Sequence, residues 1–131
     1  MSKAKTVVLS VDDESIPLTL RKSVLEKFGF QVIAALSGAE ALTILDAQGV
    51  DIVLTDLLMP AMNGTELARN IKQRNPELPV VLYSGVNELP EDAASADFFL
   101  SKVERPTVMC QKIEEMLMKP IASPSPSRLQ N

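Results

Sequence analysis

The apolar positions of this chain alternate between short β-rich runs and longer stretches with helical spacing. The runs are rich in β-branched residues and short enough for buried strands. They lie at Thr6–Val11, Phe30–Ala35, Ile52–Leu54, Pro79–Tyr83 and Phe98–Ser101. Polar or turn-forming residues follow each run. The pattern therefore predicts five strands separated by helices.

The stretches between these runs predict the helices. The expected ranges are Ser15–Phe28, a helix capped by Ser37 and running through Gln48, Glu66–Arg74, a short segment around Glu91–Ala96, and a last helix capped by Thr107. Ser and Thr are favoured cap residues because their hydroxyl oxygens accept a hydrogen bond from a free backbone N–H. Asn75-Pro76 should end the third helix, because proline disfavours helical backbone at the residue before it.

Most of these helices have a predicted inner face. In the first, Ile16, Leu20, Val24 and Phe28 recur every four residues and form one apolar stripe. The other expected faces are Ala41, Leu42 and Leu45; Leu67, Ala68 and Ile71; and Met109, Ile113, Met116 and Leu117. Cys110 should be a small buried or half-buried residue of the last helix.

The alternation of strands and helices predicts an α/β fold. Because a crossover between parallel strands is right-handed, the strands should form one parallel sheet with helices on both faces. A chain of 131 residues can build one domain with a proper core. We expect this domain to span residues 1–119 and the Pro/Ser-rich residues 120–131 to be disordered.

Composition excludes several classes of function. The net charge of −4, the low aromatic content of 4% and the absence of Trp argue against direct nucleic-acid binding. No apolar run approaches the roughly 18 residues that span a membrane, and no signal peptide is visible, so a cytoplasmic protein without membrane contact is expected. The chain has no His, which rules out histidine catalysis, and its single Cys excludes an internal disulfide.

Polar residues follow four of the predicted strands. Asp12 and Asp13 come after the first strand, Asp56 after the third, Ser84 after the fourth and Lys102 after the fifth. In a parallel sheet these ends meet at one edge, where open α/β sheets bind their ligands. If the strands are ordered 2-1-3-4-5, the first and third strands are neighbours and the three carboxylates lie side by side.

These groups suit phosphoryl transfer. Three close carboxylates repel one another and favour a hard, oxygen-binding cation such as Mg²⁺, for which Mn²⁺ can substitute. The cation would let an ionised Asp56 approach a phosphoryl group. Lys102 would screen charge on the phosphoryl oxygens, and the Ser84 hydroxyl could donate to one of them. Positioning and charge neutralisation would then suffice to transfer the group onto Asp56.

Each of these residues also has a plainer interpretation when it is taken alone. Asp12 and Asp13 could form a solvated loop that caps the following helix, and an Asp or Ser at the end of a strand is commonly a turn residue. A lone Lys102 is usually surface charge. The joint occurrence at four corresponding strand ends favours the functional interpretation over this set of coincidences.

From about Lys5 to Lys119 the sequence resembles the response-regulator receiver domain of two-component signalling. The resemblance rests on VDDE after the first strand, TDLLMPAMNG after the third, Ser-Gly after the fourth and FFLSK at the fifth. Together, in this order and spacing, these motifs are highly specific. The resemblance implies a flavodoxin-like, doubly wound (βα)5 fold with the strand order 2-1-3-4-5.

The resemblance also implies a role for each site residue. Asp56 looks like the phosphoacceptor, and Asp12 and Asp13 look like the acidic pair that holds magnesium together with Asp56. The backbone carbonyl of Leu58 would be a further metal ligand. Lys102 takes the position of the phosphate-contacting lysine. The implied switch residues are Ser84, which supplies the hydroxyl, and Phe99, which supplies the aromatic ring.

The sequence departs from the family pattern in three places. The segment from Ser84 to Lys102 is shorter than usual by about one helical turn, so the fourth helix should be short or irregular. Val103 stands where the family commonly has a cis proline; a cis bond there would cost about 3 kcal/mol, so we expect a trans bond and a shifted loop. Leu58 and Val86 are apolar and cannot orient a water, which predicts a long-lived phosphoryl group on Asp56.

The resulting functional hypothesis is a phosphorelay switch without an output domain in this chain. It would accept a phosphoryl group from a sensor histidine kinase or phosphotransfer protein, act on an unidentified protein target, and exist as a monomer or weak dimer. It would catalyse only its own phosphorylation and dephosphorylation. The alternative is a pseudo-receiver that acts as an interaction module without phosphorylation. A haloacid-dehalogenase-type phosphatase is disfavoured, because Leu58 stands where a second Asp is needed.

Overall fold

The five predicted strands form one parallel sheet. A computed structural model describes residues 5–85, 96–102 and 104–118 of the chain. Its strands are β1 (Val7–Val11), β2 (Gln31–Ala35), β3 (Ile52–Asp56), β4 (Val80–Ser84) and β5 (Phe98–Ser101). Their order in the sheet is β2-β1-β3-β4-β5, which confirms the predicted doubly wound topology.

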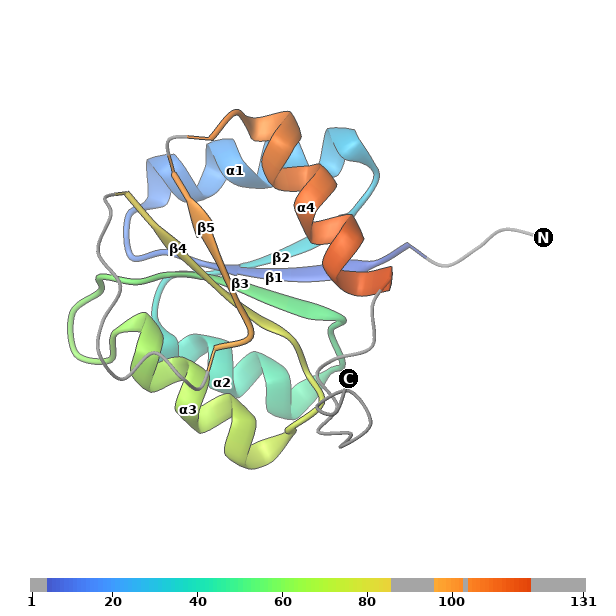
Figure 1. Cartoon of the computed structure of the whole chain (residues 1–131). Helices are drawn as coiled ribbons and strands as arrows, with labels where there is room; N and C mark the ends of the chain where they lie inside the picture. The colour runs from blue at the N-terminus through green and yellow to red at the C-terminus, as the bar shows by residue number, and fades with distance from the viewer. Residues whose placement is uncertain (1–4, 86–95, 103, 119–131) are drawn as a thin grey trace, which may run out of the picture.

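Helices cover both faces of the sheet (Figure 1). Helices α1 (Ser15–Phe28) and α4 (Pro106–Met118) pack on one face, and α2 (Gly38–Ala47) and α3 (Gly64–Arg74) pack on the other. None of these helices has the length and apolarity needed to cross a bilayer. Except for Ala96, the predicted short helix at 91–96 lies outside the described residues. Val86, Val103 and the tail from residue 120 also lie outside them.

The inner strand β1, which lies between β2 and β3, explains why two cores form. Its side chains alternate between the faces of the sheet. Val8 packs in the core under α1 and α4, and the next residue, Leu9, packs in the core under α2 and α3. The partner strand β3 follows the same alternation, since Ile52 pairs with Val8 and Val53 with Leu9. Strands buried on both faces are expected to be largely apolar, and the polar residues of these two are Ser10 in β1 and Thr55 and Asp56 at the end of β3.

The helix starts are only partly as predicted. Ser37 caps α2 and accepts a hydrogen bond of 3.0 Å from the backbone N–H of Glu40, as expected. Helix α3 begins at Gly64, two residues before the predicted start, because Asn63 and Glu66 form a capping box. Thr107 does not precede the last helix, because α4 already begins at Pro106. Proline suits that first position, where no helical N–H partner is needed.

The inner face predicted for α1 is mostly wrong, and of its four residues only Val24 packs against the core. Ile16 and Leu20 are 73% and 63% exposed, whereas the buried residues of this helix are Leu18, Arg21 and Leu25. A stripe with a spacing of four residues drifts around an α-helix that has 3.6 residues per turn. The observed face has spacings of three and four residues, and it includes a charged residue that an apolar pattern passes over. The other predicted inner faces agree with the two cores.

Two leucines of α1 test this corrected face. Leu25 is fully buried, so Leu25→Ala should lower the free energy of unfolding by about 2–5 kcal/mol. Leu20→Ala removes the same side-chain atoms from an exposed position and should change it by less than about 1 kcal/mol. Urea denaturation of both variants measures the difference. Equal losses would contradict the assignment of the buried face.

Candidate functional site

The carboxyl edge of the sheet, at the left of Figure 1, collects the predicted site residues. Asp12 and Asp13 follow β1, Asp56 is the last residue of β3, Ser84 is the last residue of β4, and Lys102 follows β5. Strand register brings their backbones together, because Thr55, Asp56 and Ser84 pair with Val11, Tyr83 and Ser101. The proximity expected from the strand order is therefore present.

The three aspartates form a compact acidic cluster. One carboxylate oxygen from each of Asp12, Asp13 and Asp56 lies within 4.8 Å of the others. Asp12 and Asp56 are buried, with 1% and 7% exposure, and Asp13 is exposed. Carboxylate oxygens at this spacing are the donors that Mg²⁺ and Mn²⁺ prefer. The side chains present therefore fit a divalent cation, with Asp13 open to water ligands.

Lys102 is the direct partner of Asp56. Its Nζ lies 2.6 Å from Oδ1 of Asp56, and its backbone N–H donates to the carbonyl of Ser84 at 2.7 Å. The second contact fixes the end of β5 against β4 and so aims the side chain at the cluster. Burial raises the pKa of Asp56 above its ordinary 3.8; Lys102 opposes this shift and the nearby Asp12 adds to it.

Sequence reasoning missed Arg21, a buried cation beside the cluster. Its Nη2 donates to Oδ2 of Asp12 at 3.0 Å, and the two side chains are 7% and 2% exposed. Its guanidinium carbon lies 4.5 Å from the centre of the Tyr83 ring, and Lys102 Nζ lies 5.7 Å from the same centre. The available signal was its spacing from Leu18 and Leu25, which places a charge on the buried side of α1.

The loop between β3 and α3 packs tightly against Asp56. The backbone N–H of Gly64 donates to the carbonyl of Leu57 at 2.8 Å. A Cβ atom at Gly64 would overlap the carbonyl oxygen of Asp56, so this position requires glycine. Within the loop, Ala61 has a φ of 67°, in the left-handed region that non-glycine residues seldom adopt. The Asn63-Gly64 pair predicted a turn, but nothing in the sequence predicted that Gly64 would lie against the carbonyl oxygen of Asp56.

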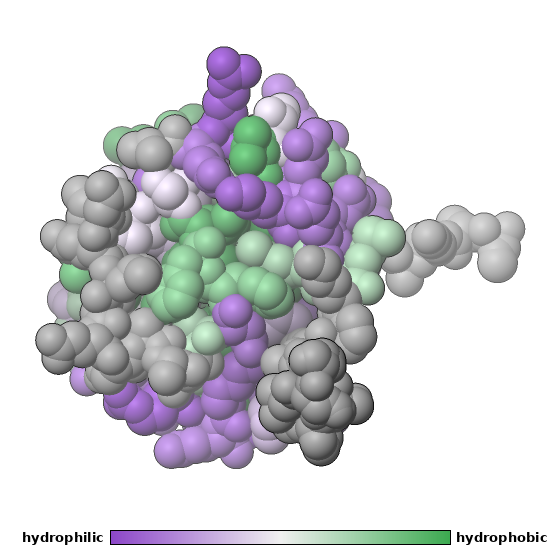
Figure 2. All heavy atoms as spheres, in the orientation of Figure 1, coloured by the Kyte–Doolittle hydropathy of each residue, from purple (hydrophilic) through white to green (hydrophobic). Residues whose placement is uncertain are grey.

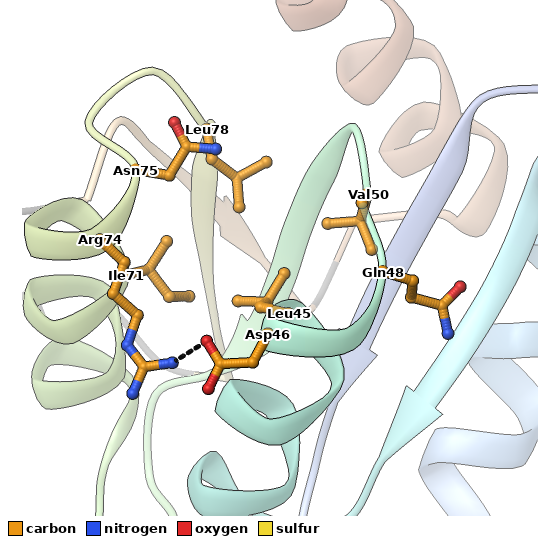
Figure 3. A pocket seen from close by; sticks show the side chains of 9 residues that line it. Leu45, Asp46, Gln48, Val50, Ile71, Arg74, Asn75 and Leu78 are labelled. Atoms are coloured by element: carbon orange, nitrogen blue, oxygen red, sulfur yellow. Dashed lines mark hydrogen bonds and ion pairs between the residues drawn. The ribbon is translucent and has the colours of Figure 1, made fainter.

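An open cavity of about 320 Å³ lies above the cluster. Its lining includes Asp13, Asp56, Leu58, Ser84 and Lys102. A larger cavity of about 360 Å³ lies at the opposite edge of the sheet, between the ends of α2 and α3 (Figure 3). There Arg74 and Asp46 point toward one another and form an ion pair of 2.6 Å. That cavity contains no acidic cluster, so the candidate site is the one at the carboxyl edge.

The remaining predicted positions lie around this cavity and on β5. Leu58 is 68% exposed, and Ser84 is half-buried. Phe99 is 41% exposed, so its side chain is not part of either core. Figure 2 shows apolar side chains gathered over β5, between the hydrophilic surfaces of α4 and α3.

Comparison with known protein families agrees with this fold. The family model of the response regulator receiver domain matches residues 8–114. The match extends from β1 into α4 and includes every predicted site residue. The chain therefore belongs to the response regulator receiver domain family.

Relatives with curated functions place this domain inside longer proteins. The chain is 32% identical to the transcriptional regulatory protein GlrR of Escherichia coli, over 89% of the chain and 27% of GlrR. It is 33% identical to the sensor kinase CckA of Brucella abortus, over 91% of the chain and 13% of CckA. The chain thus spans about a quarter or less of the length of these relatives.

Solved structures of receiver domains are similar along almost their whole length. A receiver domain protein from Methanospirillum hungatei superimposes with a TM-score of 0.80 at 28% identity, over 88% of this chain and 95% of that one. The response regulator TrrA from Thermotoga maritima, solved in complex with Mg²⁺-BeF, has a TM-score of 0.80 at 25% identity, over 85% and 98%.

The raised pKa of Asp56 gives a prediction about stability. The folded protein holds the Asp56 proton more tightly than the unfolded chain, so the ionised form costs stability at neutral pH, and this cost disappears as the pH falls below 3.8. Asp56→Asn should therefore raise the melting temperature at pH 7 by a few degrees, and the gain should shrink on acidification.

Thermal denaturation between pH 7 and pH 3 measures this gain. Glu77→Gln, at an exposed position away from the site, is the matched control for loss of one carboxylate. A lower melting temperature for Asp56→Asn at pH 7 would show that the ion pair with Lys102 outweighs the burial of the charge.

Proposed function

We propose that this domain is a phosphorelay switch that accepts a phosphoryl group on Asp56 from a sensor histidine kinase or a phosphotransfer protein. The observation that carries the proposal is the arrangement at the carboxyl edge. Asp56 is buried, with Lys102 Nζ at 2.6 Å and two further aspartates within 4.8 Å, and an open cavity is lined by Asp13, Asp56 and Lys102. A single carboxylate at a strand end would not justify it.

The transfer needs little covalent chemistry from the protein. A carboxylate oxygen of Asp56 attacks the phosphorus, the bond from phosphorus to the donor nitrogen breaks, and the nitrogen keeps the electron pair and takes up a proton. Lys102 already touches Asp56, so a short movement of its ammonium would carry it to a phosphoryl oxygen. Ser84 lines the same cavity and could donate its hydroxyl proton to another phosphoryl oxygen.

The acidic cluster supports a divalent cation as the cofactor. Asp12, Asp13, Asp56 and the backbone carbonyl of Leu58 would hold it. A bound Mg²⁺ neutralises negative charge as the phosphoryl group approaches the carboxylates. The complex of TrrA with Mg²⁺-BeF supports this choice of metal. Mn²⁺ would suit the same oxygen donors.

The output would be a change in partner binding. Ser84 ends β4 and Phe99 lies on the neighbouring β5, so movement of the hydroxyl toward a phosphoryl group would open space in which the ring could turn inward. The exposed apolar surface over β5 would then change (Figure 2). Such a change suits a signalling protein that acts on a downstream protein and catalyses only its own phosphorylation and dephosphorylation.

A pseudo-receiver that binds partners without phosphorylation is the second candidate. Val103, which stands where the family commonly has proline, is the feature of the chain that favours it. It requires that the cluster and Lys102 form without accepting a phosphoryl group. The two candidates therefore differ in one measurable property, the reactivity of Asp56.

Phosphorylation of Asp56 can be tested by intact mass. After incubation with Mg²⁺ and acetyl phosphate, the protein should gain the mass of one phosphoryl group. Asp56→Asn and samples with EDTA should gain none. Asp46→Asn, a carboxylate change at the opposite edge of the sheet, should behave like the wild type.

The absence of histidine from the chain simplifies this measurement, because an acid-labile adduct cannot be phosphohistidine. No adduct with acetyl phosphate and with a second small donor would favour the pseudo-receiver. An adduct that persists in Asp56→Asn would place the phosphoacceptor elsewhere.

Leu58 gives a second prediction, on the lifetime of the phosphoryl group. Its exposed apolar side chain lines the cavity and cannot hydrogen-bond an attacking water. Leu58→Asn supplies an amide there and should speed loss of phosphate several-fold, as followed by intact mass after removal of the donor. Leu36→Asn, at an exposed leucine away from the cavity, is the control. An unchanged rate in Leu58→Asn would contradict this explanation of a long lifetime.

A further inference from the structure

Arg21 is the group near the site that the proposed function leaves unexplained. It is 8% exposed and reaches Asp12 from the buried face of α1. Among the described residues its Nη1 has no hydrogen-bond partner, although the atom is buried. A buried arginine with an unsatisfied N–H is costly. The presence of such an arginine at this buried position calls for a role beyond packing.

The contacts of Asp12 suggest that role. One carboxylate oxygen accepts from the backbone N–H of Glu14 at 2.9 Å, and the other accepts from Arg21 at 3.0 Å. Both oxygens of Asp12 are therefore engaged by this chain's own donors. The ring of Tyr83 supports the guanidinium from the side of β4. Arg21 is thus held in place at the inner end of the acidic cluster.

The contact between Arg21 and Asp12 affects how strongly the cluster can bind a metal ion. Three carboxylates within 4.8 Å repel one another, and two cations, Arg21 and Lys102, contact the buried pair among them. Each cation stabilises the metal-free cluster. Each also repels an incoming divalent cation, and Arg21 does so from a buried position where water screens it poorly.

We propose that Arg21 is a positioning residue that serves as the resident counter-ion of Asp12, so that the metal-free fold depends on it and Mg²⁺ binds against its charge. The inference rests on the proposed function, because it takes the acidic cluster as the metal site. It adds that the chain itself limits the affinity of that site. The domain would then fold without metal and exchange metal readily.

Two substitutions on the same helix separate this role from packing. Arg21→Met removes the buried charge and keeps a long apolar stem. Lys22→Met removes an equal charge from an exposed pair with Glu26, on the surface of α1. Isothermal titration with MgCl₂ gives the dissociation constant, and thermal denaturation with and without Mg²⁺ gives the stability.

If Arg21 is the counter-ion of Asp12, its removal should lower the stability of the metal-free fold and raise the affinity for Mg²⁺. Arg21→Met should melt at a lower temperature without metal, bind Mg²⁺ on the order of tenfold more tightly, and gain more in melting temperature from Mg²⁺ than the wild type. Lys22→Met should keep a dissociation constant close to the wild-type one. Arg21→Lys, which restores the charge, should return the affinity toward the wild type.

The outcomes also separate this inference from the proposed function. Equal or weaker Mg²⁺ binding by Arg21→Met would overturn the counter-ion role and leave Arg21 a packing residue. If Arg21→Met folds only with Mg²⁺, that rescue supports the role, and Arg21→Gln, which keeps a donor near Asp12, must then show the tighter binding. Failure of the wild type to bind Mg²⁺ would instead overturn the metal site of the proposed function.

Discussion

The repulsion between buried carboxylates is the constraint around which this domain is built. Asp12 and Asp56 are almost fully removed from water, and Asp13 stands beside them. Such a cluster is stable only if cations lie beside the carboxylates, since an uncompensated buried charge lowers the stability of the fold strongly. The chain supplies Lys102 from the end of β5 and Arg21 from α1. Three carboxylates face only two cations, so the cluster keeps an excess of negative charge, which under the proposed function favours binding of a metal.

The apolar sheet offsets the destabilising effect of this cluster of charges. Its strands are mostly apolar and separate two cores, each of which is closed by a pair of helices. The three aspartates and Lys102 lie at the carboxyl ends of the strands, and Arg21 reaches Asp12 from α1. Polar chemistry is thereby confined to one edge, and apolar burial stabilises the remainder.

Strand positions could be predicted from the sequence because a short apolar run ended by a charge has few alternative structures. The alternation predicted a parallel sheet, and the resemblance to receiver domains supplied the strand order that brings Asp12, Asp13, Asp56, Ser84 and Lys102 together. The inner face of α1 was beyond the pattern, because Ile16 and Leu20 look buried by spacing alone. Arg21 was missed for a related reason: its importance comes from Asp12 and Tyr83, which are distant in sequence and adjacent only in the folded sheet.

The close approach of Gly64 to Asp56 has a mechanical consequence. The first turn of α3 contacts the main chain of β3 at Asp56, and a Cβ atom at Gly64 would have no room there. The capping box of Asn63 and Glu66 makes that turn stiff. The α3 side of the site is therefore rigid, and Asp56 cannot move toward α3. Under the proposed function, a displacement that starts at Asp56 would be directed away from α3 and toward β4 and β5.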